Sequence, residues 1–217
     1  MSVDGMRPER LQRITNLVKQ RQFDLTVVLE NVHDAHNIGA VMRSCDCVGI
    51  KEIYVLYSSD RLNENELIIG KRTSAGARKW VDVLYFEDTK TCFEAVKSKY
   101  DQVLGTHLSK EAKSLYELDL NKSTALVFGN EHRGISEEAL KYLDGNFIIP
   151  QFGMVESLNI SVACAVSLYE AARQRNAQNR YENEIEGDAA REALLESYIE
   201  RQVLKHVGRD PKDGRLS

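Results

Sequence analysis

Two polar turns in this sequence concentrate side chains that can do chemistry. The first, at residues 129–134, has the sequence Gly-Asn-Glu-His-Arg-Gly and directly follows the apolar run Ala125–Phe128. The second, at residues 151–159, follows the apolar run Phe147–Ile149 and opens a long segment rich in alanine. Ligands of open α/β sheets bind beyond the carboxyl ends of the strands. We therefore expect the functional site where these two turns face each other.

Two common nucleotide-binding loops are absent from the sequence. A phosphate-binding loop needs Lys-Ser/Thr after its second glycine, whereas Gly134 is followed by Ile135 and Ser136. No Gly-x-Gly occurs in the 217 residues, so no turn offers the close backbone approach that a dinucleotide pyrophosphate requires. The sequence therefore disfavours a nucleoside triphosphatase and an enzyme that uses NAD or FAD.

A third polar segment, Asn-Ile-Gly-Ala-Val-Met-Arg at residues 37–43, lies upstream of the two turns. Together the three segments resemble, in the same order, the three motifs of the SpoU (TrmH) family of RNA 2′-O-methyltransferases. The resemblance covers roughly residues 7–180. Residues 21–27, Arg-Gln-Phe-Asp-Leu-Thr-Val, are similar to the branch of the family that methylates the D-loop guanosine of tRNA, at position 18.

The resemblance implies transfer of the methyl group of S-adenosyl-L-methionine to a ribose 2′-hydroxyl of tRNA, without a protein nucleophile. It assigns the catalytic positions to Arg43, Asn37, Glu131, Ser157 and Asn159. Glu131 could fix Arg43 or Asn37, and Ser157 and Asn159 could hold the ribose. Ser and Asn are also preferred helix N-caps, so capping of the following helix remains an alternative role for these two.

Activation of the 2′-hydroxyl is expected to depend on Arg43, because this residue matches the essential arginine of the first motif. Without the resemblance, a lone arginine on a helix would be interpreted as a surface ion-pair partner. A guanidinium is effectively always protonated. It can bind a phosphate bidentately or stabilise a developing alkoxide in an ordinary environment, whereas its role in proton transfer is left open.

The resemblance places the S-adenosyl-L-methionine pocket at Thr106, Gly129, Ile149 and Leu158. Backbone groups are expected to make most of these contacts, because the four side chains are chemically plain. No metal is expected. His33 and His36 are three residues apart, but a transition-metal site needs further ligands that the sequence does not place.

The elements that must position these residues alternate along the chain. Apolar runs predict strands, and apolar residues at helical spacing predict helices. The expected strands are 25–29, 52–57, 81–86, 102–106, 125–128 and 147–149, and the expected helices are 8–22, 38–48, 89–100, a short one from 136, 159–176 and 187–207. Asn37 and Asp88 are expected to be N-caps. The alternation predicts an α/β fold in which helices cover both faces of a mostly parallel sheet.

Three parts are expected along the chain. These are a basic N-terminal helical extension at residues 1–23, a methyltransferase domain at 24–176 and a C-terminal helical extension at 177–217. A chain of 217 residues with 42% hydrophobic content can bury one good core. The resemblance further implies a SPOUT-type domain with a deep C-terminal trefoil knot, and a homodimer. Topology rules alone would not predict a knot.

The formal net charge of −4 argues against indiscriminate binding of polyanions, but basic residues cluster locally. Residues 1–23 contain five Lys/Arg and two acids, and residues 69–80 contain four and none. Such patches suit a chosen RNA surface. The expected RNA contacts are Arg10, Arg13, Arg21, Lys71, Arg72, Arg78, Arg201 and Lys205. A solvated basic face is the alternative for each run.

Nothing in the sequence predicts a membrane span or an export leader, so a cytoplasmic location is expected. The four cysteines, Cys45, Cys47, Cys92 and Cys164, lack metal-type spacing. In a reducing compartment they are expected to remain thiols and to pack as small core residues.

Three other functions stay open from the sequence alone. A ribosomal RNA methyltransferase of the same family often has a separate N-terminal RNA-binding domain, whereas about two dozen residues precede the first expected strand here, which suits one helix and favours tRNA. A non-catalytic RNA-binding or chaperone module is disfavoured because Asn37, Arg43 and Glu131 are all present. A small-molecule methyltransferase is compatible with the pocket but not with the basic flanks.

Overall fold

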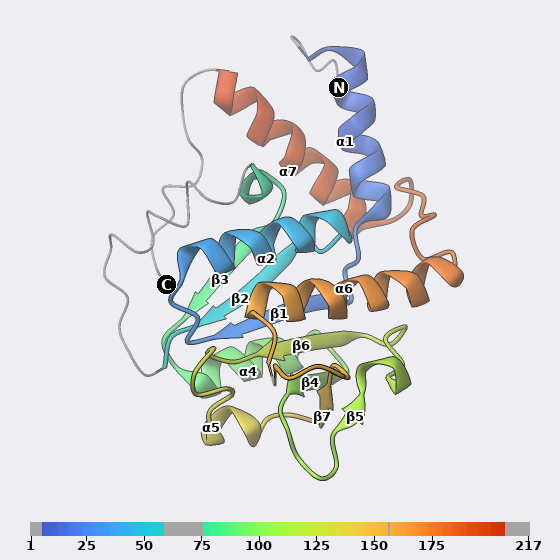
Figure 1. The fold of residues 1–217 in the computed structure, drawn as a ribbon. Coiled ribbons are helices and arrows are strands. Elements are labelled where there is room, and N and C mark those ends of the chain that lie inside the picture. Colours follow the sequence, from blue (N-terminus) through green and yellow to red (C-terminus); the bar gives the residue numbers. More distant parts are fainter. Residues whose placement is uncertain (1–5, 59–75, 156, 207–217) are drawn as a thin grey trace. The chain divides into compact units, whose positions relative to one another are not determined.

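The centre of the molecule is one sheet of parallel strands. The structure is a computed structural model that describes residues 6–58, 76–155 and 157–206, with side chains up to Val203. The strands are β1 Leu25–Glu30, β2 Glu52–Leu56, β3 Asp82–Phe86, β4 Gln102–Thr106, β5 Lys113–Ser114, β6 Thr124–Phe128 and β7 Gly145–Ile148. Their order in the described chain is β3-β2-β1-β6-β4-β7-β5, and every pairing is parallel (Figure 1).

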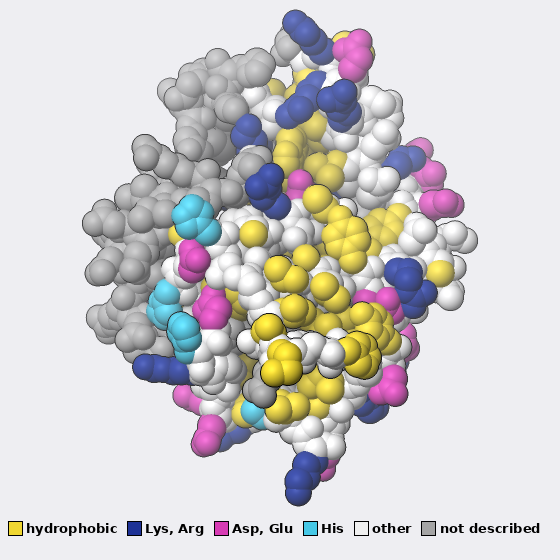
Figure 2. Space-filling view, in the orientation of Figure 1, with side chains coloured by type: hydrophobic (Ala, Val, Ile, Leu, Met, Phe, Trp, Pro, Cys, Tyr) yellow, Lys and Arg dark blue, Asp and Glu magenta, His cyan; other side chains and the backbone are white. Residues whose placement is uncertain are grey.

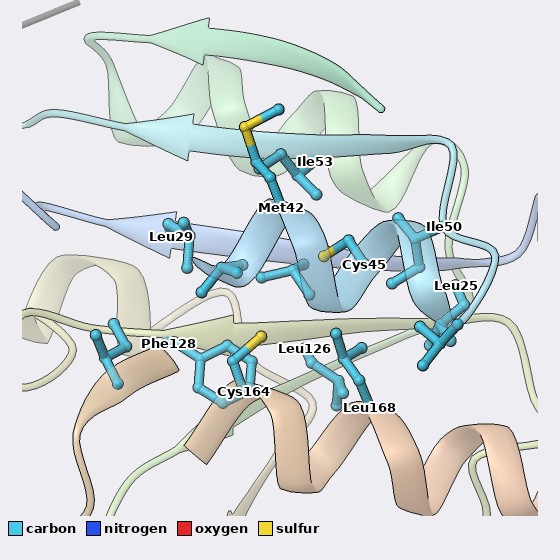
Figure 3. Close-up of a cluster of buried hydrophobic side chains, with 14 of the residues drawn as sticks. Leu25, Leu29, Met42, Cys45, Ile50, Ile53, Leu126, Phe128, Cys164 and Leu168 are labelled. Atoms are coloured by element: carbon cyan, nitrogen blue, oxygen red, sulfur yellow. The ribbon is translucent and has the colours of Figure 1, made fainter. Parts of the chain in front are cut away.

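Helices cover both faces of this sheet, as the alternating pattern predicted. The helical elements here are α2 Ala35–Cys47, α4 Thr89–Lys97, α5 Glu137–Leu140 and α6 Ile160–Ala177, with the 3-10 turns η1 Ala77–Lys79 and η2 Leu115–Glu117. Leu25 and Leu29 of β1 face a core shared with α2 and α6, which includes Met42 and Cys164 (Figure 3). Val28 of the same strand faces a second core with α4 and α5. Each buried strand therefore serves two cores, which is why its sequence is a continuous apolar run.

The start of α2 differs from the prediction that Asn37 caps the helix. The helix begins at Ala35, and the N-cap is Asp34, whose side chain accepts a hydrogen bond from the His36 backbone N–H at 2.8 Å. Aspartate caps as well as asparagine does, so the earlier residue initiates the helix. Asn37 lies inside the first turn, and its amide is directed to partners outside the helix.

Other boundaries agree closely with the expectations. Strand β4 has the predicted bounds, and Asp88 caps α4 by accepting a hydrogen bond from the Thr91 backbone N–H at 2.8 Å. The two-residue edge strand β5 and both 3-10 turns were not predicted, since segments this short leave no periodic signal. Cys47 is exposed, so its prediction as a core residue is wrong, whereas the other three cysteines are buried and all four are free thiols.

The carboxyl end of α6 is fastened to the amino ends of β1 and β6 by one fully buried arginine, Arg175. Its guanidinium forms an ion pair with Asp24 at 2.6 Å and donates to the backbone oxygens of Leu120 and Lys122 at 2.9 and 2.8 Å. It also donates to the side chain of Gln22 at 3.0 Å. A buried guanidinium is tolerated only when its donors are satisfied in this way.

The chain forms two compact units, Gln22–Gln178 and a second made of Met1–Arg21 with Asn179–Ser217. In the second unit, α1 Pro8–Gln20 packs against α7 Ala189–His206. Lys19 pairs with Glu184 at 2.7 Å. Arg21 donates a hydrogen bond to the Tyr198 hydroxyl at 3.2 Å. No described helix combines the length and the apolar character that crossing a bilayer requires.

Candidate active site

The strand order places a reversal point beside β1 and β6. From β1 the chain proceeds to β2 and β3 on one side, whereas β4, β7 and β5 lie on the other side of β6. The two central strands are paired in register up to Leu29 and Phe128. Crevices for ligands form beyond the carboxyl ends of strands at such a reversal. The polar turns that follow β1 and β6 both lie at this point.

Three of the predicted catalytic residues are joined here by hydrogen bonds. The Asn37 side-chain amide donates to the Glu131 carboxylate at 2.7 Å. The Asn159 amide donates to the side-chain oxygen of Asn37 at 3.1 Å. Glu131 and Asn159 are exposed and Asn37 is half-buried, so the chain of three side chains can meet a ligand. Residues that are 94 and 122 positions apart in the sequence thus form one polar cluster.

The turn at residues 129–134 is closed on itself, which fixes where Glu131 points. The backbone groups of Asn130 and Gly134 exchange two hydrogen bonds of 3.0 and 2.8 Å. The Asn130 side chain accepts from the backbone N–H groups of His132 and Arg133 at 2.9 and 3.1 Å. Gly134 has φ +67°, the left-handed region that glycine adopts without a steric penalty.

Asn159 has the capping role, one of the two roles that the sequence left open for it. It is the N-cap of α6, and its side-chain oxygen accepts from the backbone N–H and the hydroxyl of Ser161 at 2.9 and 2.6 Å. Its amide nitrogen remains available for Asn37. Ser157 is exposed and forms no hydrogen bond within the described residues.

Arg43 is not part of this cluster within one chain. Its side chain is exposed, and it forms no hydrogen bond or ion pair in the part of the chain that the structure describes. Arg43 follows Asn37 by six residues on α2, which places it about 9 Å further along the helix and on a different face. Of the two partners considered for Glu131, the structure joins it to Asn37.

Three of the four predicted cofactor residues lie at the carboxyl ends of neighbouring strands. Thr106 is the last residue of β4, Gly129 follows β6 and Ile149 follows β7, and these three strands are neighbours. The Thr106 hydroxyl donates to the Val127 backbone oxygen at 3.3 Å. Leu158 is 39% exposed in the loop that leads to α6.

The loop that follows β7 has backbone groups without partners among the described residues. The backbone groups of residues 149–155 and 157–158 form no hydrogen bonds within the part of the chain that the structure describes. Free backbone donors and acceptors beside exposed apolar side chains, such as Leu108 and Leu158, suit an adenine ring and an amino-acid group. The residues present therefore fit the cofactor that the resemblance implied.

The predicted RNA contacts have different outcomes. Arg10 and Arg13 are exposed on α1, Arg78 is half-buried in η1, and Arg201 is half-buried, with its guanidinium 5.2 Å from the Tyr198 ring centre. The expectation for Arg21 is wrong for this structure, because its side chain is fully buried and bonded to Tyr198. The remaining expected contacts lie outside the described residues or side chains: Lys71, Arg72 and Lys205.

A buried charge cluster lies at the amino end of β2. The polar turns of the candidate site lie at the other end of the sheet, beyond the carboxyl ends of the strands. Glu52 accepts hydrogen bonds from Lys51 and Lys99 at 2.8 and 2.9 Å. Burial raises the pKa of Glu52, but the two lysines lower it by more, so that it lies below the ordinary value of 4.5. No predicted site residue belongs to this cluster.

Sequence reasoning missed Glu30 and Asn31, which contact the turn at residues 129–134. Asn31 has φ +53° and accepts a backbone hydrogen bond from the Asn130 amide at 2.8 Å. Glu30 accepts two hydrogen bonds from Ser136. The available signal was a carboxylate, Glu30, at the end of an apolar run. The next residue, Asn31, belongs to a type that adopts the left-handed backbone more readily than most residues other than glycine.

Comparison with known proteins gives consistent relatives. A model of the SpoU rRNA Methylase family matches residues 24–169. A tRNA (guanosine(18)-2'-O)-methyltransferase of Thermus thermophilus is 44% identical over 167 residues, which are 76% of this chain and 83% of the relative. The enzyme of the same name from Escherichia coli is 38% identical over 192 residues, 88% of this chain and 82% of the relative.

A solved structure agrees with these relatives. The A. aeolicus TrmH/SpoU tRNA modifying enzyme superposes with a TM-score of 0.75 at 32% identity, and the match covers 90% of this chain and 97% of that one.

Proposed function

Since this chain belongs to the SpoU rRNA Methylase family, we propose that it methylates the ribose 2′-hydroxyl of guanosine 18 in tRNA, with S-adenosyl-L-methionine as methyl donor. The observation that carries this proposal is the similarity, over most of the chain, to relatives named for this activity, at 38% identity over 192 residues for the Escherichia coli enzyme. The cluster of Asn37, Glu131 and Asn159 supplies polar groups suited to a ribose.

Binding and orientation are the main tasks of the residues on the page. When bound, S-adenosyl-L-methionine supplies an activated methyl group on a sulfonium. The backbone groups of Thr106 at the end of β4, of Gly129 after β6 and of Ile149 after β7 would hold it at the carboxyl ends of these strands, together with Leu158. Holding the acceptor oxygen in line with the donor methyl group removes much of the entropic barrier to transfer.

The polar cluster binds the ribose in this proposal. One oxygen of Glu131 accepts from Asn37, and its other oxygen remains available to accept from a ribose hydroxyl. Asn37 has a second amide hydrogen to donate. Ser157 and Asn159 complete the ribose contacts from the start of α6, where Asn159 is held as the cap.

Arg43 provides the positive charge in this proposal. An exposed guanidinium that forms no bond within the described chain keeps its donors available for a tRNA phosphate. A guanidinium carries a positive charge, so it can stabilise the negative charge that develops on the 2′-oxygen while the hydroxyl proton passes to solvent water. Because no bond joins Arg43 to Glu131 within the described chain, the proposal has the bound tRNA or a second subunit complete the site.

A homodimer is part of the proposal. Hydrophobic side chains gather over α6 and the loop before it (Figure 2). The exposed ones are Phe152, Met154, Val155, Leu158, Val162 and Tyr169, and Phe152 and Met154 are 99% and 98% exposed. Such patches mark contact surfaces, and α2, which carries Arg43, packs against α6. Val162→Glu should halve the particle mass that analytical ultracentrifugation measures for the wild type. Equal masses of the wild type and the variant would refute this surface as the dimer interface.

The remaining parts of the proposal rest on the family resemblance and on the clusters of basic residues. The domain from residue 24 to 176 contains the deep trefoil knot of the family, and a tRNA substrate favours a cytoplasmic location. The two end extensions dock tRNA through Arg10 and Arg13, with Arg78, Arg201, Lys71, Arg72 and Lys205 as further contacts. Affinity for tRNA should then fall steeply with salt, and a flat salt response would remove these residues.

Nucleoside mass spectrometry tests the proposed reaction. A tRNA transcript is incubated with the protein and S-adenosyl-L-methionine, digested and analysed for 2′-O-methylguanosine. A transcript with guanosine 18 should gain one methyl group, and a transcript with adenosine 18 should gain none at that position. Methylation of a ribosomal RNA fragment but of no tRNA would assign the chain to the ribosomal branch, and binding of RNA without methylation would make it a non-catalytic module.

A further inference from the structure

Glu30 is a fully buried carboxylate at the carboxyl end of β1, directly below the polar cluster. Alternation along the strand turns Val28, and with it Glu30, towards the core shared with α4 and α5. Within the described chain Glu30 forms no ion pair. Burying a carboxylate is expensive unless donors compensate for the lost water, so the donors that Glu30 has found must be held firmly.

Ser136 supplies both of those donors. Its backbone N–H and its hydroxyl donate to the two carboxylate oxygens of Glu30 at 2.9 and 2.5 Å. The same hydroxyl accepts from the Ala139 backbone N–H at 3.2 Å, so Ser136 is also the N-cap of α5. The pair therefore locks the point where the chain leaves the turn at residues 129–134 and enters α5.

The other end of the turn is held by the next residue of the chain. The Asn130 amide donates to the Asn31 backbone oxygen at 2.8 Å. The left-handed backbone of Asn31 is itself fixed by Ser58, which donates its N–H to the Asn31 side chain at 3.0 Å. Two consecutive residues at the end of β1 thus anchor both ends of one loop.

Glu131 lies between these anchors and reaches Asn37 across a gap of 2.7 Å. Besides its covalent link to β6 at Gly129, the turn is joined to the sheet by these two anchors, so a shift at either anchor moves Glu131 relative to Asn37. We propose that the buried Glu30–Ser136 pair positions Glu131 for catalysis, acting as a second layer beneath the residues that meet the ribose. The catalytic consequence rests on the proposed function, whereas the anchoring itself does not.

Ser136→Ala removes the hydroxyl donor and leaves one Glu30 oxygen buried without a partner. Because small misplacements of a reacting constellation are costly, kcat for tRNA methylation should fall by about 10- to 100-fold. KM for S-adenosyl-L-methionine should stay within about twofold, because Thr106, Ile149 and Leu158 lie outside the turn and Gly129 is held by its covalent link to β6. Ser136→Thr keeps the hydroxyl and the cap and should restore most of the activity. An unchanged kcat in Ser136→Ala would overturn the proposal.

A double-mutant cycle separates positioning from a general loss of stability. If Ser136 acts through Glu131, then Ser136→Ala should have less than about a twofold further effect on kcat in a Glu131→Ala background. Independent, multiplied losses would refute the proposal, as would a Glu131→Ala variant with normal kcat. The matched control is Asp88→Ala, which removes the N-cap of α4 and should lower thermal stability while leaving kcat unchanged.

Hydrogen exchange gives a readout that needs no activity. The backbone N–H groups of His132, Arg133 and Gly134 are bonded within the turn. Ser136→Ala should accelerate exchange in residues 130–136, whereas Asp88→Ala should not. Equal exchange in the wild type and Ser136→Ala would refute the anchor even if the enzyme is active. Faster exchange in a protein that methylates no tRNA would support the anchor and refute the proposed function.

Discussion

Gly129→Ala should distort the turn that presents Glu131, because the structure leaves no room for one methyl group. A Cβ atom at this position would lie 2.2 Å from the Gly134 carbonyl carbon, 2.3 Å from the Gly134 oxygen and 2.3 Å from the Ile135 nitrogen. All three are backbone atoms, so no side chain can rotate away. Ordinary van der Waals contacts begin near 3.4 Å. The backbone at Gly134 and Ile135 must therefore move by about 1 Å.

The magnitude follows from two effects. Overpacking a rigid site costs about 1–3 kcal/mol. The same movement breaks the two backbone hydrogen bonds between Asn130 and Gly134, each worth about 1 kcal/mol. The sum is about 3–5 kcal/mol, which corresponds to a fall in Tm on the order of 10 °C for a chain of this size.

Two other glycines provide a graded comparison in the same assay. In Gly105→Ala the nearest atoms are the flexible ends of Leu143 and Ile135, at 2.4 and 2.7 Å, so rotation of these side chains should reduce the cost. Gly153→Ala meets nothing within 4 Å and should be nearly neutral. Thermal and denaturant unfolding should rank the losses Gly129, Gly105, Gly153. A Gly129→Ala protein as stable as Gly153→Ala would show that the turn is not closed as described.

Three further predictions concern separate parts of the molecule. Arg43→Ala should lower kcat by about 100- to 1,000-fold in a methyl-transfer assay with an unchanged Tm, whereas Lys90→Ala, an exposed cation on α4, should leave both unchanged; substantial residual activity would remove Arg43 from the mechanism. Because its folded-state pKa is depressed, Glu52 should stabilise the wild type over Glu52→Gln fully above about pH 4.5, and this difference should shrink as the pH falls below that value through the lowered folded-state pKa; a difference that grows as the pH falls would contradict this sign. Burial, with a contribution from Glu30, raises the pKa of the Cys92 thiol to about 12, so iodoacetamide at pH 8 should label exposed Cys47 and spare Cys92, as peptide mass spectrometry would show; early labelling of Cys92 would disprove its burial.

The sequence predicted the elements well where burial decides the pattern. Strands buried on both faces are apolar runs, so β1, β4 and β6 were located to within a residue. The first turn of α2 was misplaced because Asp34 and Asn37 are equally good caps by residue type, and only the three-dimensional partners of Asn37 distinguish them. The edge strand β5 has two residues and left no pattern.

The site was harder to derive from residues alone. Nothing local relates Asn37 to Glu131 or Asn159, because the contacts span about half the chain; the family resemblance supplied that grouping. The same resemblance could not show that Arg43 stands apart from the cluster in a single chain. Glu30 escaped notice because a carboxylate after an apolar run is usually a solvated loop residue, whereas here it is buried.

Helix α6 runs from the carboxyl ends of the strands to the amino ends of β1 and β6. Asn159 caps its first turn beside Asn37 and Glu131, and Arg175, near its other end, is fixed to the amino ends of β1 and β6. The two residues are 16 positions apart, or about 24 Å along a helix axis. If the Arg175 end of α6 shifts, the helix tilts and Asn159 at its other end moves. Weakening the contacts of Arg175 should therefore disturb methyl transfer, although Arg175 lies far from the proposed site. Saturation mutagenesis with an activity readout should therefore show that Arg175, at the amino ends of β1 and β6, is sensitive to substitution.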